Sequence, residues 1–186
     1  MNIFSILLTI VNLISNPPDI DTVTSLDLKK YEGTWYQVYD NNYNKLFISN
    51  GECIKHNYYY NYHTLLHVTY NDLNTENKTV NTLSSELVRR NSSEPGKFDF
   101  KFNNFIGNNY YVTKVGPIID DKYDYAVVTD NLGLSLFVLT RDLEKFKNIY
   151  KNEIDEFINK TYDNDEVIEY LTHPQEVENI DCKIFI

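Results

Sequence analysis

The stretch Leu134–Arg141, with the sequence LSLFVLTR, decides the fold, because apolar residues occupy both sets of its alternating positions. A period of two is typical of a β-strand, whose successive side chains point to opposite faces. A strand that is apolar on both faces needs cover on both sides. We therefore expect one face to line an interior and the other to receive a helix.

An amphipathic segment follows this strand directly. From Asp142 the apolar residues recur at helical spacing, and charged residues fill the opposite side. The Asp142 side chain is suited to cap the first turn. The pattern predicts one external helix over about 142–160, followed by an acidic, loop-like tail over 161–186.

The chain before Leu134 is predicted to form further short strands. The clearest is KFDFKF at Lys97–Phe102, where three phenylalanines share one face and charged residues share the other. Turn-forming residues separate such runs, so we predict eight strands, near 34–40, 52–60, 65–71, 78–88, 96–103, 109–115, 123–129 and 134–141. The strands alone fit an up-and-down barrel or a sandwich. The external helix favours an all-β fold with one C-terminal α-helix: an eight-stranded antiparallel barrel over about 34–141.

Length and composition limit the classes of function. The 186 residues suit one domain, and 27 acidic against 17 basic residues give a net charge of −10, which argues against nucleic acid as a partner. Two cysteines exclude a disulfide-dense mini-protein and a Cys-rich zinc module. No HExxH, Ser-His-Asp or Gly-rich phosphate motif is evident, so we predict no catalytic residue, no metal site and no cofactor.

The N-terminus suggests the compartment. Ile3–Ile14 is an uncharged apolar run, shorter than the roughly 20 residues that a membrane span needs. It fits a signal peptide at 1–16, which would leave a single secreted domain at 17–186. A buried N-terminal helix or an uncleaved anchor is the alternative, and this leaves weak membrane association open.

Secretion changes how the two cysteines are interpreted. In an oxidising compartment Cys53 and Cys182 are expected to form a disulfide, and otherwise they are two unrelated buried thiols. Three glycosylation sequons are compatible with secretion, at Asn77, Asn91 and Asn159.

Several motifs resemble the lipocalin family. Gly33-Thr34-Trp35 is similar to the Gly-x-Trp motif that opens the lipocalin barrel. Thr129-Asp130-Asn131 resembles the family's Thr-Asp-Tyr motif, and Arg141 stands where lipocalins keep an arginine. The resemblance implies structural roles for these residues, in which Arg141 stacks on Trp35 through a cation–π contact and closes the narrow end of the barrel.

A finer resemblance is to the apolipoprotein D and insecticyanin branch. Phe47–Ile54 is similar to that branch's entry into the second strand, cysteine included, and the matching bridge maps onto Cys182. The chain departs from the branch by lacking its second cysteine pair, by the altered Thr-Asp-Tyr motif and by a longer helix region.

The resemblance implies a carrier that binds or sequesters a small hydrophobic ligand inside the barrel, such as a lipid, fatty acid, retinoid or bilin. Such sites are mostly apolar, with few polar groups. Alternation along the strands gives these inward-facing ligand-binding candidates: Tyr39, Ile54, His56, Tyr58, Phe98, Phe100, Phe102, Tyr111, Tyr125 and Leu136. The facing of strand 65–71 stays open, because a slip of one residue exchanges its faces.

Two other functions are weighed against the carrier. A lipid-isomerising lipocalin needs a free, inward cysteine, whereas Cys53 shares the outward parity of its strand, so we predict no enzyme activity. A protein-binding lipocalin that acts on a host or receptor target would use loops and outer faces. His56 could bind haem iron, but we interpret it as a hydrogen-bonded histidine of the interior.

Overall fold

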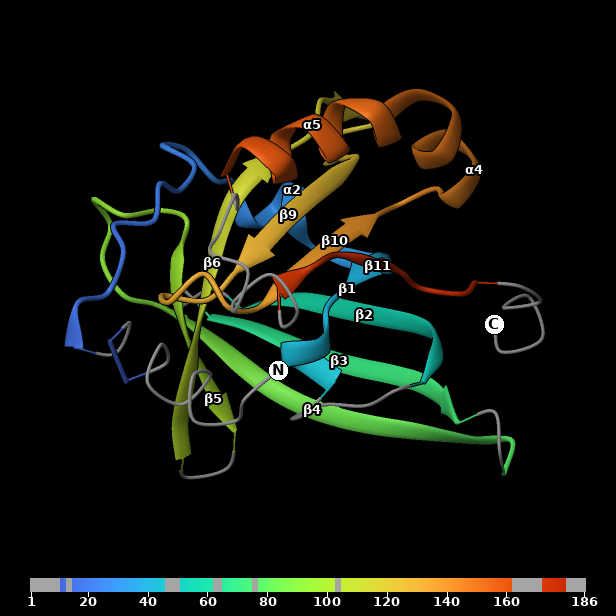
Figure 1. Cartoon of the computed structure of the whole chain (residues 1–186), viewed down its shortest axis with the longest axis horizontal. Coiled ribbons are helices and arrows are strands. Elements are labelled where there is room, and N and C mark those ends of the chain that lie inside the picture. Colours follow the sequence, from blue (N-terminus) through green and yellow to red (C-terminus); the bar gives the residue numbers. More distant parts are fainter. Residues whose placement is uncertain are drawn as a thin grey trace.

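Alternating apolar and polar residues produce antiparallel strands that close into a barrel (Figure 1). The computed structural model describes residues 11–12, 15–45, 51–61, 65–74, 77–102, 105–161 and 172–179. The barrel strands are β1 Gly33–Asp40, β2 Glu52–Asn61, β3 Leu65–Asn74, β4 Thr79–Arg89, β5 Lys97–Phe102, β6 Phe105–Val115, β9 Tyr125–Thr129 and β10 Leu136–Thr140. Neighbouring strands pair in this order, and β10 pairs back with β1. The predicted fold class is thereby confirmed.

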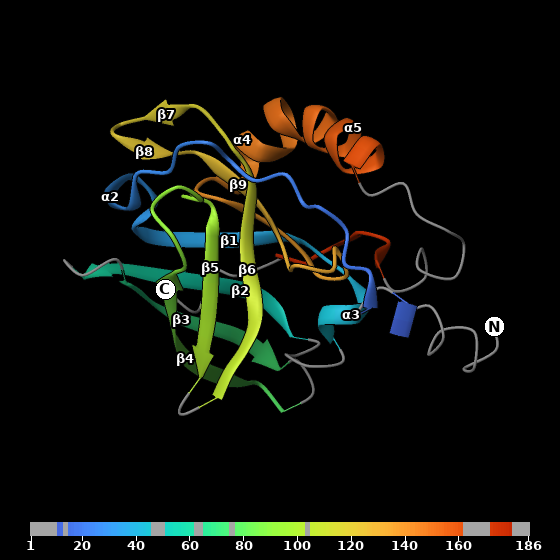
Figure 2. The same cartoon turned by 90° about the vertical axis from the view of Figure 1, so that its left-hand side faces the viewer.

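The two ends of the barrel are built differently. At the closed end, where β1 begins, the short helix α2 (Leu28–Tyr31) lies beside the hairpin of β7 (Ile118–Ile119) and β8 (Lys122–Tyr123) (Figure 2). At the far end, where β1 finishes, lie the short helix α3 (Asn42–Lys45) and the added strand β11 (Gln175–Glu176).

The C-terminal helix packs outside the barrel over β9 and β10 (Figure 1). It consists of α4 (Leu143–Lys145), the π-helical turn η1 (Phe146–Tyr150) and α5 (Lys151–Thr161). Asp142 Oδ1 accepts a hydrogen bond from the Lys145 backbone N–H at 2.9 Å, which is the predicted cap. The sequence placed this helix at about 142–160, and its segments run from Leu143 to Thr161, with a π-helical turn that was not predicted.

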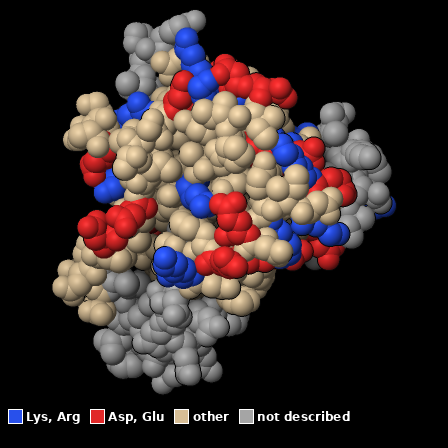
Figure 3. Space-filling model, turned by 90° about the horizontal axis from the view of Figure 1, so that it is seen from above, with Lys and Arg blue, Asp and Glu red and all other residues tan. Residues whose placement is uncertain are grey.

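Ion pairs reinforce this packing at its edges. Lys145 pairs with Asp124 at 2.7 Å, and Lys114 pairs with Glu153 at 3.0 Å, so each pair joins the helix to the barrel region. Figure 3, which looks down on the side that carries the helix, shows acidic and basic side chains next to one another on this surface.

Two apolar clusters lie on opposite sides of the β9–β10 wall. The barrel cluster, inside, comprises Leu26, Leu28, Tyr31, Trp35, Tyr58, Leu66, Val68, Leu87, Phe98, Tyr110, Val112, Tyr123, Ala126, Val128 and Leu139. The helix cluster, outside, comprises Val38, Tyr39, Tyr125, Val127, Leu136, Val138, Phe146, Tyr150, Ile154 and Ile158. A strand that serves both clusters must be apolar on both faces, as Leu134–Arg141 is.

The N-terminal prediction is not tested. Most of residues 1–16 lies outside the described part of the chain, so the division into a signal peptide and a single domain at 17–186 stays a prediction. Among the helices that are described, none has the length and hydrophobicity needed to cross a membrane.

Candidate ligand-binding site

The closed end of the barrel is held by one arginine and one tryptophan. The Arg141 guanidinium lies 3.6 Å from the ring centre of Trp35, the contact that the resemblance implies. Arg141 also donates to the backbone carbonyls of Thr34, Glu32 and Tyr123 at 2.6, 2.8 and 3.2 Å. Burial lowers the pKa of Arg141 to about 10, so the guanidinium stays charged at neutral pH.

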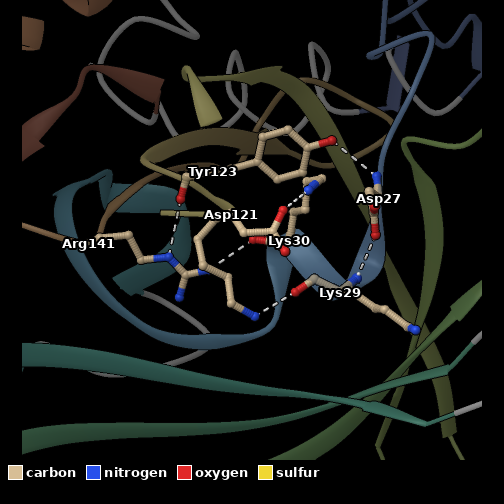
Figure 4. Close-up of polar contacts among 7 residues, drawn as sticks. Asp27, Lys29, Lys30, Asp121, Tyr123 and Arg141 are labelled. Atoms are coloured by element: carbon tan, nitrogen blue, oxygen red, sulfur yellow. Dashed lines mark hydrogen bonds and ion pairs between the residues drawn. The ribbon is translucent and has the colours of Figure 1, made fainter. Parts of the chain in front are cut away.

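Further polar contacts fasten α2 to the β7–β8 hairpin at this end (Figure 4). Lys30 forms an ion pair with Asp121, and the Tyr123 hydroxyl accepts from the Asp27 backbone N–H at 3.1 Å. Asp27 also caps α2 by accepting from the Lys29 N–H at 2.9 Å. These contacts hold the segment that closes the barrel, so we assign this end a structural role.

A chain of buried polar side chains crosses the barrel interior. Gln37 Oε1 lies 2.7 Å from His56 Nε2, and the Tyr58 hydroxyl lies 3.4 Å from His56 Nδ1. The Tyr110 hydroxyl then contacts those of Tyr58 and Tyr31, at 2.9 and 2.7 Å. Since a carbonyl oxygen only accepts, His56 donates from Nε2 and accepts at Nδ1, which fixes a neutral tautomer. Burial lowers the pKa of His56 to about 3, in keeping with this form.

Three of the predicted inward residues are buried on the interior side. His56 and Tyr58 alternate along β2, and Phe98 of β5 belongs to the barrel cluster. Ile54 is also buried, but it lies within a register shift between Glu52 and Lys55 and belongs to neither apolar cluster, so its facing stays a prediction. Phe100 is partly buried against the same cluster. The side chain of Phe102 lies outside the described part of the structure.

Three of the predicted inward residues face the helix instead. Tyr39, Tyr125 and Leu136 all belong to the helix cluster, and the hydroxyls of Tyr39 and Tyr125 donate to Asp155 and Glu153 at 2.7 and 2.9 Å. In β1 the register shifts between Gln37 and Tyr39, which breaks the alternation. In β9 and β10 both faces are apolar, so periodicity does not tell them apart. The predicted facing of these three residues is therefore wrong.

Tyr111 is the fourth error of facing. Its hydroxyl accepts from Arg90 at 2.8 Å and its ring lies under Lys97 at 5.3 Å, on the side opposite the barrel cluster. Tyr110 and Val112 face inward in its place. The prediction took the outward Lys114 as the marker for the inward face of β6. The register shifts between Val112 and Lys114, which breaks the alternation, so the facing of Lys114 does not give the facing of Tyr111.

The far end carries a second polar group of buried side chains. Asp40 Oδ1 accepts from the Asn41 N–H and from Asn44 Nδ2, both at 2.8 Å. The same Asn44 amide nitrogen donates to the Leu136 carbonyl at 2.9 Å, so α3 is fixed to the start of β10. Asp72, on β3, is also buried there.

The altered Thr-Asp-Tyr motif shapes the turn between β9 and β10. Asp130 Oδ1 accepts from the backbone N–H groups of Leu132 and Leu134, at 2.9 and 3.0 Å. The Thr129 hydroxyl donates to the Ser135 carbonyl at 2.6 Å. The Asn131 side chain takes no part in these contacts, which explains how the turn forms without the family's tyrosine.

The two cysteines are seen only in part. The backbone N–H of Cys53 donates to the Glu178 carbonyl at 3.0 Å, which brings the C-terminal segment to the start of β2. No free cysteine occurs in the described part of the chain. Because Cys182 lies outside it, the Cys53–Cys182 bridge stays a prediction.

The three sequon asparagines Asn77, Asn91 and Asn159 are all exposed, as glycosylation requires, and their use stays a prediction.

Across the described ranges no group of three His, Cys, Asp or Glu residues is arranged to hold a metal ion. His56 is satisfied by Gln37 and Tyr58 rather than by a second metal ligand.

Comparison with models of known protein families shows which family has this architecture. A family model described as a lipocalin-like domain matches residues 26–172. The chain belongs to the lipocalin family. Comparison with curated protein sequences finds no match. The finer likeness to the apolipoprotein D and insecticyanin branch stays a prediction.

Solved structures resemble this lipocalin at low sequence identity. Insecticyanin from the tobacco hornworm Manduca sexta aligns with a TM-score of 0.64 and 14% identity, over 89% of this chain and 87% of that chain. A biogenic amine-binding protein gives 0.58 and 16%, over 86% and 85%, and the cockroach allergen Per a 4 gives 0.55 and 16%, over 87% and 94%. These likenesses support the fold.

Proposed function

We propose that this lipocalin is a secreted carrier that binds or sequesters a small, largely hydrophobic molecule inside its barrel. The observation that carries the proposal is a closed barrel that turns aromatic and aliphatic side chains inward. The polar side chain of Gln37 is fully buried beside them, and its Nε2 has no hydrogen bond of good geometry in the described structure. An apolar interior with a few polar atoms is what small-molecule sites require.

The relatives support a small ligand without naming it. One structural neighbour is called a biogenic amine-binding protein, so a barrel of this kind accommodates a small molecule there. Secretion is supported by the signal-like N-terminus, the exposed sequons and the Cys53–Glu178 contact that brings the C-terminal segment toward Cys53.

We propose a carrier rather than an isomerase. The isomerase chemistry needs a reactive thiolate inside the barrel. Cys53 lies at the start of β2, where its backbone pairs with the C-terminal segment, while His56 and Tyr58 take interior positions of β2. No specific observation favours the protein-binding alternative.

Native mass spectrometry of the protein purified from the cells that secrete it tests this function. We expect an added mass of a few hundred daltons that disappears on denaturation. The proposal is wrong if the protein carries no added mass and also fails to bind any member of a panel of lipids, retinoids, bilins and aromatic amines.

Phe100→Asp is expected to weaken binding of the co-purified molecule at least tenfold. The change places an unpaired charge against the barrel cluster, at a cost of several kcal/mol. Lys101→Asp, on the exposed face of the same strand, is expected to change affinity less than twofold. Titration calorimetry measures both, after circular dichroism has shown that each variant folds. Equal losses in the two variants would contradict the inward facing of Phe100.

A further inference from the structure

We infer that the far half of the barrel holds a cation-binding subsite built on Asp72, which selects ligands that carry a protonated amine. This inference rests on the proposed carrier function, because it names the chemical class of the molecule carried.

Asp72 faces the barrel interior. In β3 the inward positions alternate through Leu66 and Val68, which belong to the barrel cluster, and Tyr70, whose ring contacts that of His56 at 5.2 Å. Asp72 is the next residue on this face, two positions further from the closed end. Its side chain is only 1% exposed.

The Asp72 carboxylate is poorly partnered for a buried charge, because Asn81, Tyr70 and the Gly51 backbone lie near it without good hydrogen-bond geometry. Neither of its oxygens has a hydrogen-bond partner of acceptable geometry in the described structure. None of the ion pairs among the described residues includes it. An unpaired buried charge costs several kcal/mol, which a cationic group from a ligand would offset.

A second carboxylate adds to the negative potential. Asp40 is 4% exposed, and unlike Asp72 it is satisfied, by Asn41 and Asn44. Burial raises the pKa of Tyr70, and Asp72 and Asp40 raise it further, so both acids lie close to the same phenol. Burial likewise raises the pKa of Asp72, while nearby polar groups of Asn81, the Gly51 backbone and Tyr70 oppose the rise.

The neighbouring groups define the rest of the ligand. The rings of Tyr70 and Phe137 both lie near His56, with ring centres 5.2 and 6.1 Å from that of the imidazole. His56 is neutral, so it adds no positive charge. Gln37 Nε2, which lies near the Asp40 carboxylate, can also donate to a hydroxyl or carbonyl of the ligand. We therefore expect small aromatic amines to bind, and we expect the two acids to disfavour fatty acids and other carboxylates.

Titration calorimetry on the full secreted chain at pH 7 tests this inference with three matched probes: 2-phenylethylamine, 2-phenylethanol and 3-phenylpropionate. We expect the amine to bind at least tenfold more tightly than the alcohol, and the propionate to bind most weakly. Asp72→Asn should lower the amine affinity at least tenfold, leave the alcohol affinity unchanged, and raise the melting temperature of the unliganded protein.

Glu144→Gln is the matched control. It removes one negative charge from an exposed position of the external helix and should leave all three affinities unchanged. Should Asp72→Asn fail to fold, the preference of the wild type for the amine over the alcohol decides the question.

The outcomes separate the two proposals. If the alcohol binds as tightly as the amine, or if Asp72→Asn binds the amine like the wild type, the cation subsite is wrong while the carrier function stands. If no probe binds and the purified protein carries no added mass, both proposals are wrong.

Discussion

Trp35→Ala is expected to lower the free energy of unfolding by about 3–5 kcal/mol, the usual range for removing a fully buried aromatic side chain. Trp35 is 0% exposed, packs on Tyr31 with ring centres 5.0 Å apart, and donates from Nε1 to the Tyr31 carbonyl at 2.8 Å. The variant also removes the ring on which Arg141 stacks. Urea unfolding followed by far-ultraviolet circular dichroism measures the loss, since the variant has no tryptophan fluorescence.

Tyr59→Ala is the control for this experiment. Tyr59 is an aromatic residue of β2 that is 59% exposed, so its removal should change stability by about 0.5 kcal/mol or less. A loss below about 1 kcal/mol for Trp35→Ala would show that the tryptophan does not hold the closed end.

The wild-type protein is expected to lose roughly 2–3 kcal/mol of stability through His56 between pH 7 and pH 4.5. Burial lowers the pKa of His56 from 6.5 to about 3, so the unfolded chain takes up a proton in this range while the folded protein does not. Stability therefore falls as the pH drops below 6.5, and the fall levels off only near pH 3.

His56→Gln keeps a polar side chain but removes this titration. Urea unfolding at the two pH values should show a fall in stability that is smaller than that of the wild type by roughly 2–3 kcal/mol. His67→Gln, on the exposed face of β3, should keep the wild-type fall. If His56→Gln and the wild type lose stability in parallel, the interior histidine is not held neutral by burial.

Periodicity predicted the elements of this fold well, because charged residues mark the outer faces of several strands. In β5 and β2 the outward Lys97 and Lys55 gave the correct facing of Phe98 and His56. The external helix followed from the two apolar faces of Leu134–Arg141. In β9 and β10, however, both faces are apolar, so no charged residue shows which face points outward.

The remaining errors come from backbone irregularities and from contacts between distant segments. Register shifts in β1 and β6 reversed the facing of Tyr39 and Tyr111, and no residue pattern announced them. The polar chain through Tyr31 and Tyr110 was not predicted either. These two tyrosines are 79 positions apart, on α2 and on β6, and their hydroxyls meet only in the folded barrel.

A crystal structure of the protein purified from its native source, together with any small molecule that co-purifies with it, tests the central claim most directly. We predict density for a small molecule within the barrel, in contact with Phe100, Phe137 and Tyr70. Density confined to the outer surface, or an interior filled by side chains alone, would contradict this account.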